Sequence, residues 1–307
     1  MTRSRCIRPI ALVAAVIGVA LPSAAAQKLI RTDDLRLDLD ARRGLRLRAF
    51  DGDLDLRFGG RLHLDVGEIT GDLTSGGSFE VRRGRLHAKG RIARDWRFVV
   101  DGDLAGADVA GGGGWRSVWV GYEGFDGVSI RVGNLISPMS MSQAIGSNYT
   151  TFAERALPDV LAPGFQTGVL VRLHGRVRPL GRAFTGLATG VFVESLGSED
   201  LDRRRSEHMS VAGRLHFAPF ARRKRVLHVG ASAEYRDVDQ GSRFRYRTRG
   251  ESRLLPPFLD TRGIAGVRSS TTWGAEAAAM WRSLSAQGEY IEARLDRAAG
   301  PNPIFEG

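Results

Sequence analysis

Thiols and lysines are both scarce in this chain of 307 residues. Its one cysteine, Cys6, lies ahead of the first apolar run, so the sequence offers no disulfide and no cysteine-ligated metal site. Three of the 45 basic side chains are lysines, and the others are arginines. Two causes explain the excess of arginine over lysine equally well: genome composition, and selection for bidentate oxyanion binding by guanidinium groups.

Beyond the N-terminus, the sequence also lacks long apolar runs. No stretch in that part approaches the ~18 consecutive apolar residues of a membrane-spanning helix. The run that does occur, Ile10 to Leu21, follows three arginines and precedes Ala24-Ala25-Ala26. This order is typical of a secretory signal peptide, and it is favoured over a buried N-terminal helix. The sequence therefore predicts a signal peptide over 1–26, Sec-dependent export, and a single mature domain over 27–307 that begins at Gln27.

The net charge of +11 falls to about +8 once the three arginines of the signal are removed. Such a basic excess suits nucleic acid, an anionic membrane surface or an anionic solute. Because export makes nucleic acid an improbable partner, we expect an anionic solute or a lipid surface.

Apolar and polar residues alternate with a period of two along most of the chain, as in Leu54, Leu56 and Phe58. Glycine- and aspartate-rich turns separate these segments, and no helical stripe of useful length follows residue 27. The pattern predicts an all-β fold, either a barrel or a sandwich. Beyond the alternating segments around 35–39, 53–58 and 61–66, strands are expected near 79–92, 96–105, 115–122, 128–134, 168–178, 183–194, 210–218, 226–238, 243–249, 271–281 and 284–294.

Three of these segments carry columns of basic residues. Side chains of a strand alternate between faces, so each column places cations on one face and apolar or small residues on the other. This arrangement suits a barrel wall with a wet, anion-attracting interior, although one such column also fits a solvated sheet face. The columns comprise Arg83, Arg85, His87, Lys89 and Arg91; Arg172, His174, Arg176 and Arg178; and Arg243, Arg245, Arg247 and Arg249.

The stretch from Ser137 to Phe165 interrupts the alternation and contains three prolines. A loop of this length in a compact domain is usually functional. It is either an ordinary surface loop or a loop that folds inward and narrows a pore.

Motifs of known enzymes and metal sites are missing. The sequence contains no G-x-S-x-G, no H-E-x-x-H and no carboxylate–histidine spacing that would hold a metal ion. We therefore expect no enzyme, no cofactor and no metal.

Several blocks in order resemble the phosphate- and polyphosphate-selective porins, the porin O and P family of Gram-negative outer membranes. The blocks span about 58–294. They are Phe58-Gly59-Gly60-Arg61-Leu62, Arg82-Arg83, Asp95-Trp96-Arg97-Phe98, Val132-Gly133-Asn134, Ser147-Asn148-Tyr149 with Glu154-Arg155, Val226 to Gly230 with Tyr235-Arg236-Asp237, and Trp273 to Glu276 with Ser285 to Tyr290.

The resemblance implies a transmembrane antiparallel β-barrel of 16 strands, a homotrimer in outer-membrane lipid, and a pore lined by arginines. It implies passage of small inorganic anions such as phosphate and polyphosphate. Carried over by motif, the anion pathway comprises Arg61, Arg82, Arg83, Arg85, Arg236, Arg245, Arg247 and Arg249. The constriction loop contributes Asn148 and Arg155.

Two features depart from the family pattern. Asn148 stands where a constriction lysine is expected, and a neutral amide supplies no fixed charge, so anion preference is expected without strict phosphate selectivity. About 12 to 13 strands are visible against 16 in the family. The end, Asn302 to Gly307, reads as neither a strand nor a terminal aromatic, so missing C-terminal strands are expected; closure as a smaller barrel is the alternative.

The sequence thus favours an outer-membrane, anion-selective porin. Two alternatives remain open at this point: a soluble periplasmic β-protein that binds polyanions, and an outer-membrane barrel enzyme.

Overall fold

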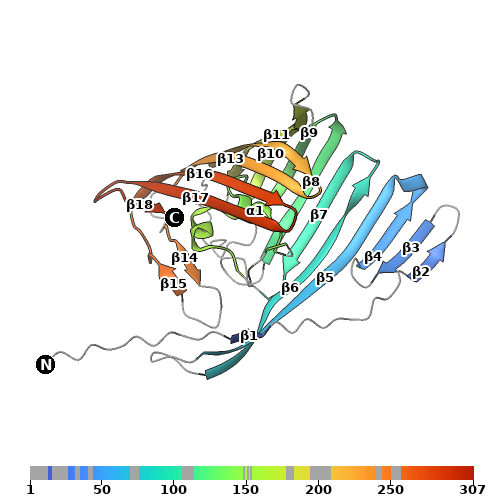
Figure 1. The fold of residues 1–307 in the computed structure, drawn as a ribbon, viewed down its shortest axis with the longest axis horizontal. Helices are drawn as coiled ribbons and strands as arrows, with labels where there is room; N and C mark the ends of the chain where they lie inside the picture. The colour runs from blue at the N-terminus through green and yellow to red at the C-terminus, as the bar shows by residue number, and fades with distance from the viewer. Residues whose placement is uncertain are drawn as a thin grey trace.

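Alternating sequence produces strands along the whole chain, and in the computed structural model they join a 16-stranded antiparallel sheet (Figure 1). The sheet curls into a deep trough, and its two ends, at β2 and β18, are not joined. The structure describes residues 13–15, 27–31, 35–40, 44–69, 76–105, 114–147, 149–150, 152, 154–177, 183–193, 209–238, 244–249 and 257–307.

The strands follow one another in the sheet in nearly sequential order, so consecutive strands form hairpins. They are β1 (Val13–Ala15), β2 (Gln27–Arg31), β3 (Leu35–Asp40), β4 (Gly44–Ala49), β5 (Leu54–Ile69), β6 (Gly76–Ile92), β7 (Trp96–Asp103), β8 (Gly114–Phe125), β9 (Val128–Ile136), β10 (Phe165–Val177), β11 (Ala183–Val193), β12 (Ser210–Arg222), β13 (Arg225–Asp237), β14 (Arg247–Arg249), β15 (Pro257–Asp260), β16 (Val267–Trp281), β17 (Leu284–Arg297) and β18 (Ile304–Glu306).

Helical structure in the described residues is limited to α1 (Met141–Ala144) and the 3-10 turns η1 (Phe50–Gly52) and η2 (Leu157–Leu161). No helix in this part of the chain is long and apolar enough to cross a membrane.

The expected strands from β6 to β13, and β16 and β17, are confirmed with shifts of a few residues at their ends. Two expectations are wrong. The segment 243–249 is not a wall strand, because β14 pairs only with β15 in a separate two-stranded sheet inside the β13–β16 connection. The C-terminal residues do form a strand: β18 pairs with β17 at Glu292, Ala293 and Arg294. Pro301 and Pro303 precede β18, and the alternation that remains after them is too short to predict a strand from the sequence.

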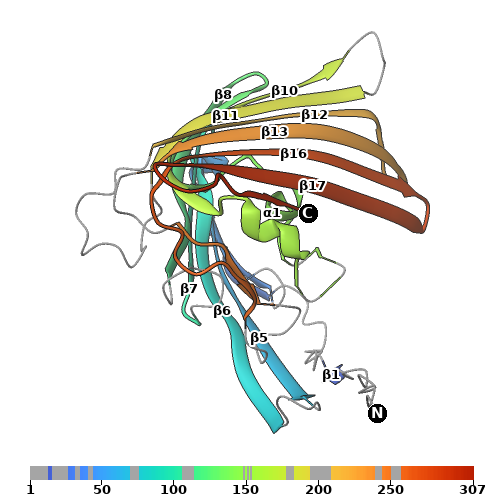
Figure 2. The same cartoon turned by 90° about the vertical axis from the view of Figure 1, so that its left-hand side faces the viewer.

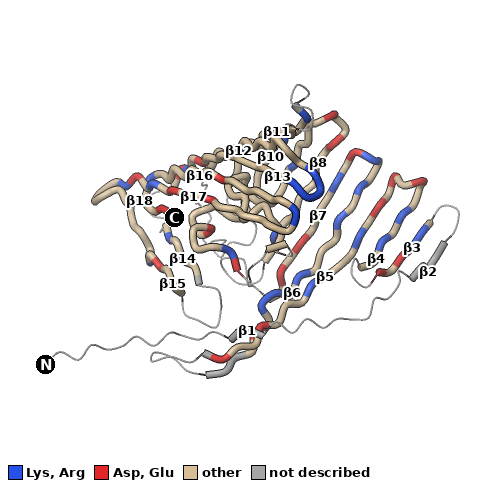
Figure 3. The backbone as a smooth tube through the Cα atoms, viewed as in Figure 1, with Lys and Arg blue, Asp and Glu red and all other residues tan. Residues whose placement is uncertain are grey.

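The two faces of the sheet differ in chemistry. On β13, the exposed Leu227, Val229 and Tyr235 alternate with the more buried His228, Ser232 and Glu234. Residues opposite each other in a ladder share a face, so the pairing carries this division from strand to strand. Figure 3 shows many charged positions along β3 to β7. The convex face is thus apolar, and the concave face carries polar and charged residues together with the buried cluster described below.

Aromatic residues gather near both ends of the convex face. Trp96 contacts Tyr122 at a ring distance of 5.2 Å beside the short β6–β7 turn, and Trp281 lies at the equivalent end of β16. Trp273 and Tyr290 contact each other at 5.3 Å further along β16 and β17. At ~3.3 Å per residue, the stretch from Trp273 to Trp281 covers roughly 26 Å along the strand, comparable to the ~25 Å apolar band of outer-membrane barrels.

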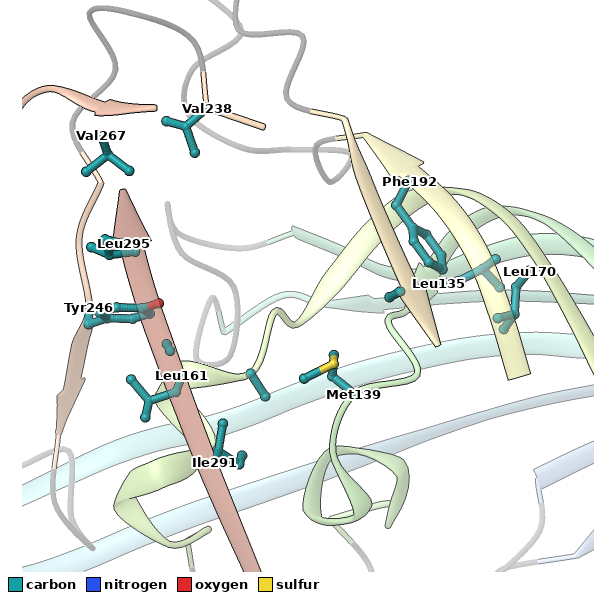
Figure 4. Close-up of a cluster of buried hydrophobic side chains, with 13 residues drawn as sticks. Leu135, Met139, Leu161, Leu170, Phe192, Val238, Tyr246, Val267, Ile291 and Leu295 are labelled. Atoms are coloured by element: carbon teal, nitrogen blue, oxygen red, sulfur yellow. The ribbon is translucent and has the colours of Figure 1, made fainter. Parts of the chain in front are cut away.

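A hydrophobic cluster lies on the concave side of β10 to β12 and β17 (Figure 4). There Met139 and Leu161, from the β9–β10 connection, join Phe192 and Ile291 of the wall. Tyr246, from the β13–β16 connection, packs on Phe305 of β18 at a ring distance of 5.2 Å. These contacts fasten both long connections to one half of the trough.

Candidate functional site

The β9–β10 connection, residues 137–164, lies inside the trough, where Figure 2 shows α1 surrounded by strands. Its first half is held by β17 and β13. The Glu289 carboxylate accepts hydrogen bonds from the Ser140 hydroxyl (2.9 Å) and from the backbone N–H of Met141 (2.8 Å). Because Ser140 is also the N-cap of α1, this carboxylate satisfies the free N–H groups at the start of the helix.

Arg155 closes the other end of α1. Its guanidinium donates to the carbonyl oxygens of Ser142 and Ile145, each at 3.0 Å. A cation beside the last carbonyls of a helix is favourable. Arg155 therefore holds the shape of the loop in addition to placing a positive charge on it.

The second half of the loop reaches β6, where a β-bulge lets two neighbouring arginines point toward the loop. In the β5–β6 ladder His63 pairs with Arg83 and Leu64 pairs with Val81, so Arg82 is the extra residue. A bulge re-aims side chains, and here both guanidiniums contact the same carboxylate. Arg82 lies 2.5 Å and Arg83 3.4 Å from oxygens of Glu154. Each of the two arginines is only 5% exposed.

Arg61 and Arg85 hold the loop at a second point. They are directly opposite each other in the β5–β6 ladder, and both donate to the Ser147 hydroxyl, at 2.8 Å and 2.9 Å. Arg85 also forms an ion pair of 2.9 Å with the buried Asp103 of β7. The loop thus spans the trough, from β13 and β17 on one side to β5 and β6 on the other.

Arg116 of β8 completes this group and was missed by sequence reasoning. It lies 3.4 Å from Asp101, stacks on the Phe165 ring at 4.6 Å, and is close enough to Arg61, Arg85 and Arg155 for their charges to interact. The β7–β8 ladder changes register between Val100 and Gly102, which disturbs the alternation around Arg116. We name Arg61, Arg82, Arg83, Arg85 and Arg116 the arginine group.

A family model, "Phosphate-selective porin O and P", matches residues 56–307, most of the chain. The chain belongs to this family. It is similar to Porin O of Pseudomonas aeruginosa, with 25% identity over 92% of this chain and 68% of the relative. The convex apolar face, the charged trough and the inward loop are the features expected of an outer-membrane porin, a protein that forms a channel.

The remaining residues predicted for the porin's anion pathway lie away from the arginine group. Arg236 of β13 pairs with Glu234 at 3.0 Å. Arg245 and Arg247 lie 2.5 Å and 3.8 Å from Asp260, on the two-stranded β14–β15 sheet. Of Arg249 only the backbone, paired with Pro257, is described, and Asn148 lies outside the described residues.

The third basic column of the sequence is therefore not part of the porin wall. Alternation of arginine with aromatic residues also fits an exposed hairpin, and here Arg245 and Arg247 face the acidic partner Asp260. Their guanidiniums, Arg245 foremost, hold the pKa of Asp260 below its usual value. The described residues of the other two columns do lie on the wall: the ladders place Arg85 beside Asp103, and Arg172 opposite Ala188. Arg178 and Arg243 lie outside the described residues.

Among the described residues of the porin, no group of three or more histidine, cysteine, aspartate or glutamate side chains is arranged to hold a metal ion. Arginine–carboxylate pairs offset part of the charge in the trough.

Asp159, in η2, couples the loop to pH. Burial raises the pKa of its carboxyl to about 6; Arg155 opposes the shift and Glu289 adds to it. Because the folded loop binds this proton more tightly than the unfolded chain does, stability falls as pH rises from 4 through 6. We expect the loop to be more protected at pH 5 than at pH 7.5, by roughly 1–2 kcal/mol.

Amide hydrogen exchange of residues 137–164 at the two pH values measures this difference. Asp159→Asn should remove it and leave protection high at both. Equal protection at both pH values in the unaltered chain would contradict the assignment to Asp159.

Proposed function

We propose that the chain conducts phosphate and related small anions through a constriction between the arginine group and the inward loop. The observation that carries the proposal is the convergence of four guanidiniums on one short segment of the loop, at Ser147 and Glu154. Arg116 adds a fifth positive charge close to Arg155 of the same loop. An anion that enters a narrow pore loses water, and guanidinium groups replace that water with charge-assisted hydrogen bonds.

Weak binding at each step is as necessary as attraction. Conduction requires sites that an ion can enter and also leave. Asp101, Asp103 and Glu154 lie among the arginines and offset part of their charge. With Asn148 in place of a lysine, we expect a preference for anions with modest discrimination between phosphate, polyphosphate and chloride.

Planar-bilayer recording of the purified full-length chain tests the proposal. Reversal potentials in a chloride gradient should show anion preference, and phosphate should inhibit the chloride current. Cation preference, or chloride currents that phosphate leaves unchanged, would overturn it.

Two further properties belong to the proposal. Export by the signal over 1–26 should give a mature chain that begins at Gln27, which N-terminal sequencing of outer-membrane protein checks. A homotrimer should give a band of three chains in unheated detergent gels. A soluble periplasmic protein is not favoured, because the convex face exposes large apolar side chains on many strands, including Leu62, Leu215 and Val229.

The apolar face yields a prediction of its own. Val229 lies on the convex face midway between the strand positions level with Trp281 and Trp273. We expect Val229→Arg to weaken membrane insertion by roughly 2–4 kcal/mol, because a cation then meets the hydrocarbon midplane. Folding into lipid vesicles across a urea series measures the change. His228→Arg is the matched control, since it keeps a basic group beside Glu276 on the concave face; equal tolerance of both variants would argue against a lipid-facing side.

A further inference from the structure

A groove runs along the concave face of β11, away from the inward loop. The ladders place Gly186 between His174 and His216, and Ala188 between Arg172 and Arg214. Residues opposite each other share a face, so small residues form the floor and basic residues form both sides. The resulting cavity has a volume of about 600 Å³ and extends to the β8–β9 turn. Small-molecule sites typically occupy ~300–1,000 Å³.

Phenyl and imidazole rings line one end of this groove. The Phe184 ring stacks on His216 at 5.8 Å with an interplanar angle of 28°, and it lies 6.3 Å from His174. His216 lies directly over Gly186, where an added Cβ would come within 2.4 Å of the imidazole. The absence of a side chain at position 186 therefore leaves room for the His216 ring inside the groove.

Positive charge at the other end exceeds the local carboxylates. Glu276 is shared by Arg214 (2.6 Å) and His228 (2.6 Å). Glu123 is shared by Arg97 (2.6 Å) and Arg131 (3.3 Å).

Arg172 is exposed, and no carboxylate in the described part of the chain lies within ion-pair distance of it. It is close enough to Arg131 and His216 for their charges to interact. Arg131 itself is held by Glu123 and by the Trp119 ring, whose centroid lies 4.4 Å from its guanidinium carbon.

We propose that this groove binds an anion that carries a flat aromatic ring, such as an aromatic carboxylate or aryl phosphate. The anionic group pairs with Arg172, and the ring packs beside Phe184 and His216. Planar side chains favour a flat ring over a puckered one of the same size, and guanidinium favours a planar carboxylate. The site is separate from the arginine group, and its occupancy does not depend on conduction.

Calorimetric titration of the refolded full-length chain in detergent, with benzoate as ligand, tests the proposal. Cyclohexanecarboxylate has the same charge without the flat ring, and we expect benzoate to bind roughly three- to tenfold more tightly. Arg172→Gln should weaken both ligands by about fivefold or more. Phe184→Leu should remove the preference for benzoate and leave cyclohexanecarboxylate binding in place.

Arg61→Gln is the matched control: it removes one arginine from the inward-loop site and should leave benzoate binding unchanged. Equal affinity of the unaltered chain for the two carboxylates would overturn the proposal, as would benzoate binding that Arg61→Gln weakens as much as Arg172→Gln does. Neither outcome bears on chloride and phosphate currents, which test the proposed pore separately.

Discussion

Replacing Arg61 and Arg83 together by glutamine should weaken phosphate inhibition of the chloride current by about tenfold or more. Both guanidiniums contact the inward loop. There they would donate hydrogen bonds to a passing anion, in place of the water that the anion has lost. A hydrogen bond to a charged group contributes ~1.5–3 kcal/mol when it is well formed, and a wet pore reduces that value. Dose–response curves for phosphate in single-channel recordings measure the change. Arg85 is left in place, because its removal would strand the buried Asp103 without its partner.

The matched control removes the same amount of charge elsewhere. Arg245 and Arg247 lie on the exposed β14–β15 sheet and share Asp260. Exposed ion pairs contribute ~0–1 kcal/mol, so the Arg245→Gln, Arg247→Gln variant should fold normally and shift phosphate inhibition by less than about twofold. If the two double variants have equal effects, phosphate responds to net charge alone and the arginine group has no special role.

Much of the sheet could be predicted because a strand needs only a period of two. The segments from β6 to β13 satisfy it clearly, and their ladders place Arg85 and Arg172 on the concave face as the alternation predicts. The same period cannot tell a wall strand from a short hairpin. Arg245 and Arg247 therefore resembled a wall column, although their acidic partner, Asp260, lies in a hairpin of a long connection.

The site itself depends on contacts that a linear pattern does not carry. The family motif singled out Arg82 and Arg83, but strict alternation places neighbours on opposite faces, and only the bulge against His63 and Leu64 explains how both reach one carboxylate. Arg116 was missed because a register change interrupts the alternation around it. Ser147 and Glu154 lie in a loop whose sequence has no periodicity. Their contacts with β5 and β6 form because the sheet curls around the loop.

Glu154→Gln should strengthen phosphate binding by about tenfold, an effect opposite in sign to that of the arginine variants. The Glu154 carboxylate lies between two guanidiniums that are 5% exposed, where it competes with any anion for Arg82 and Arg83. Neutralising it removes a contacting carboxylate from two buried cations, and a buried charge that loses a partner is costly. An oxyanion from solution relieves that cost. Tenfold tighter binding corresponds to ~1.4 kcal/mol.

Ser147→Ala separates competition from anchoring. It removes the hydroxyl that accepts from Arg61 and Arg85, so it loosens the loop while every charge stays in place. Phosphate inhibition should change little in this variant. Thermal unfolding gives a second readout, because a ligand that binds only the folded state raises the melting temperature. Phosphate should raise it more in Glu154→Gln than in the unaltered chain or in Ser147→Ala. If Glu154→Gln weakens phosphate inhibition, or matches Ser147→Ala in both measurements, the Glu154 carboxylate is an anchor of the loop and not a competitor for the anion.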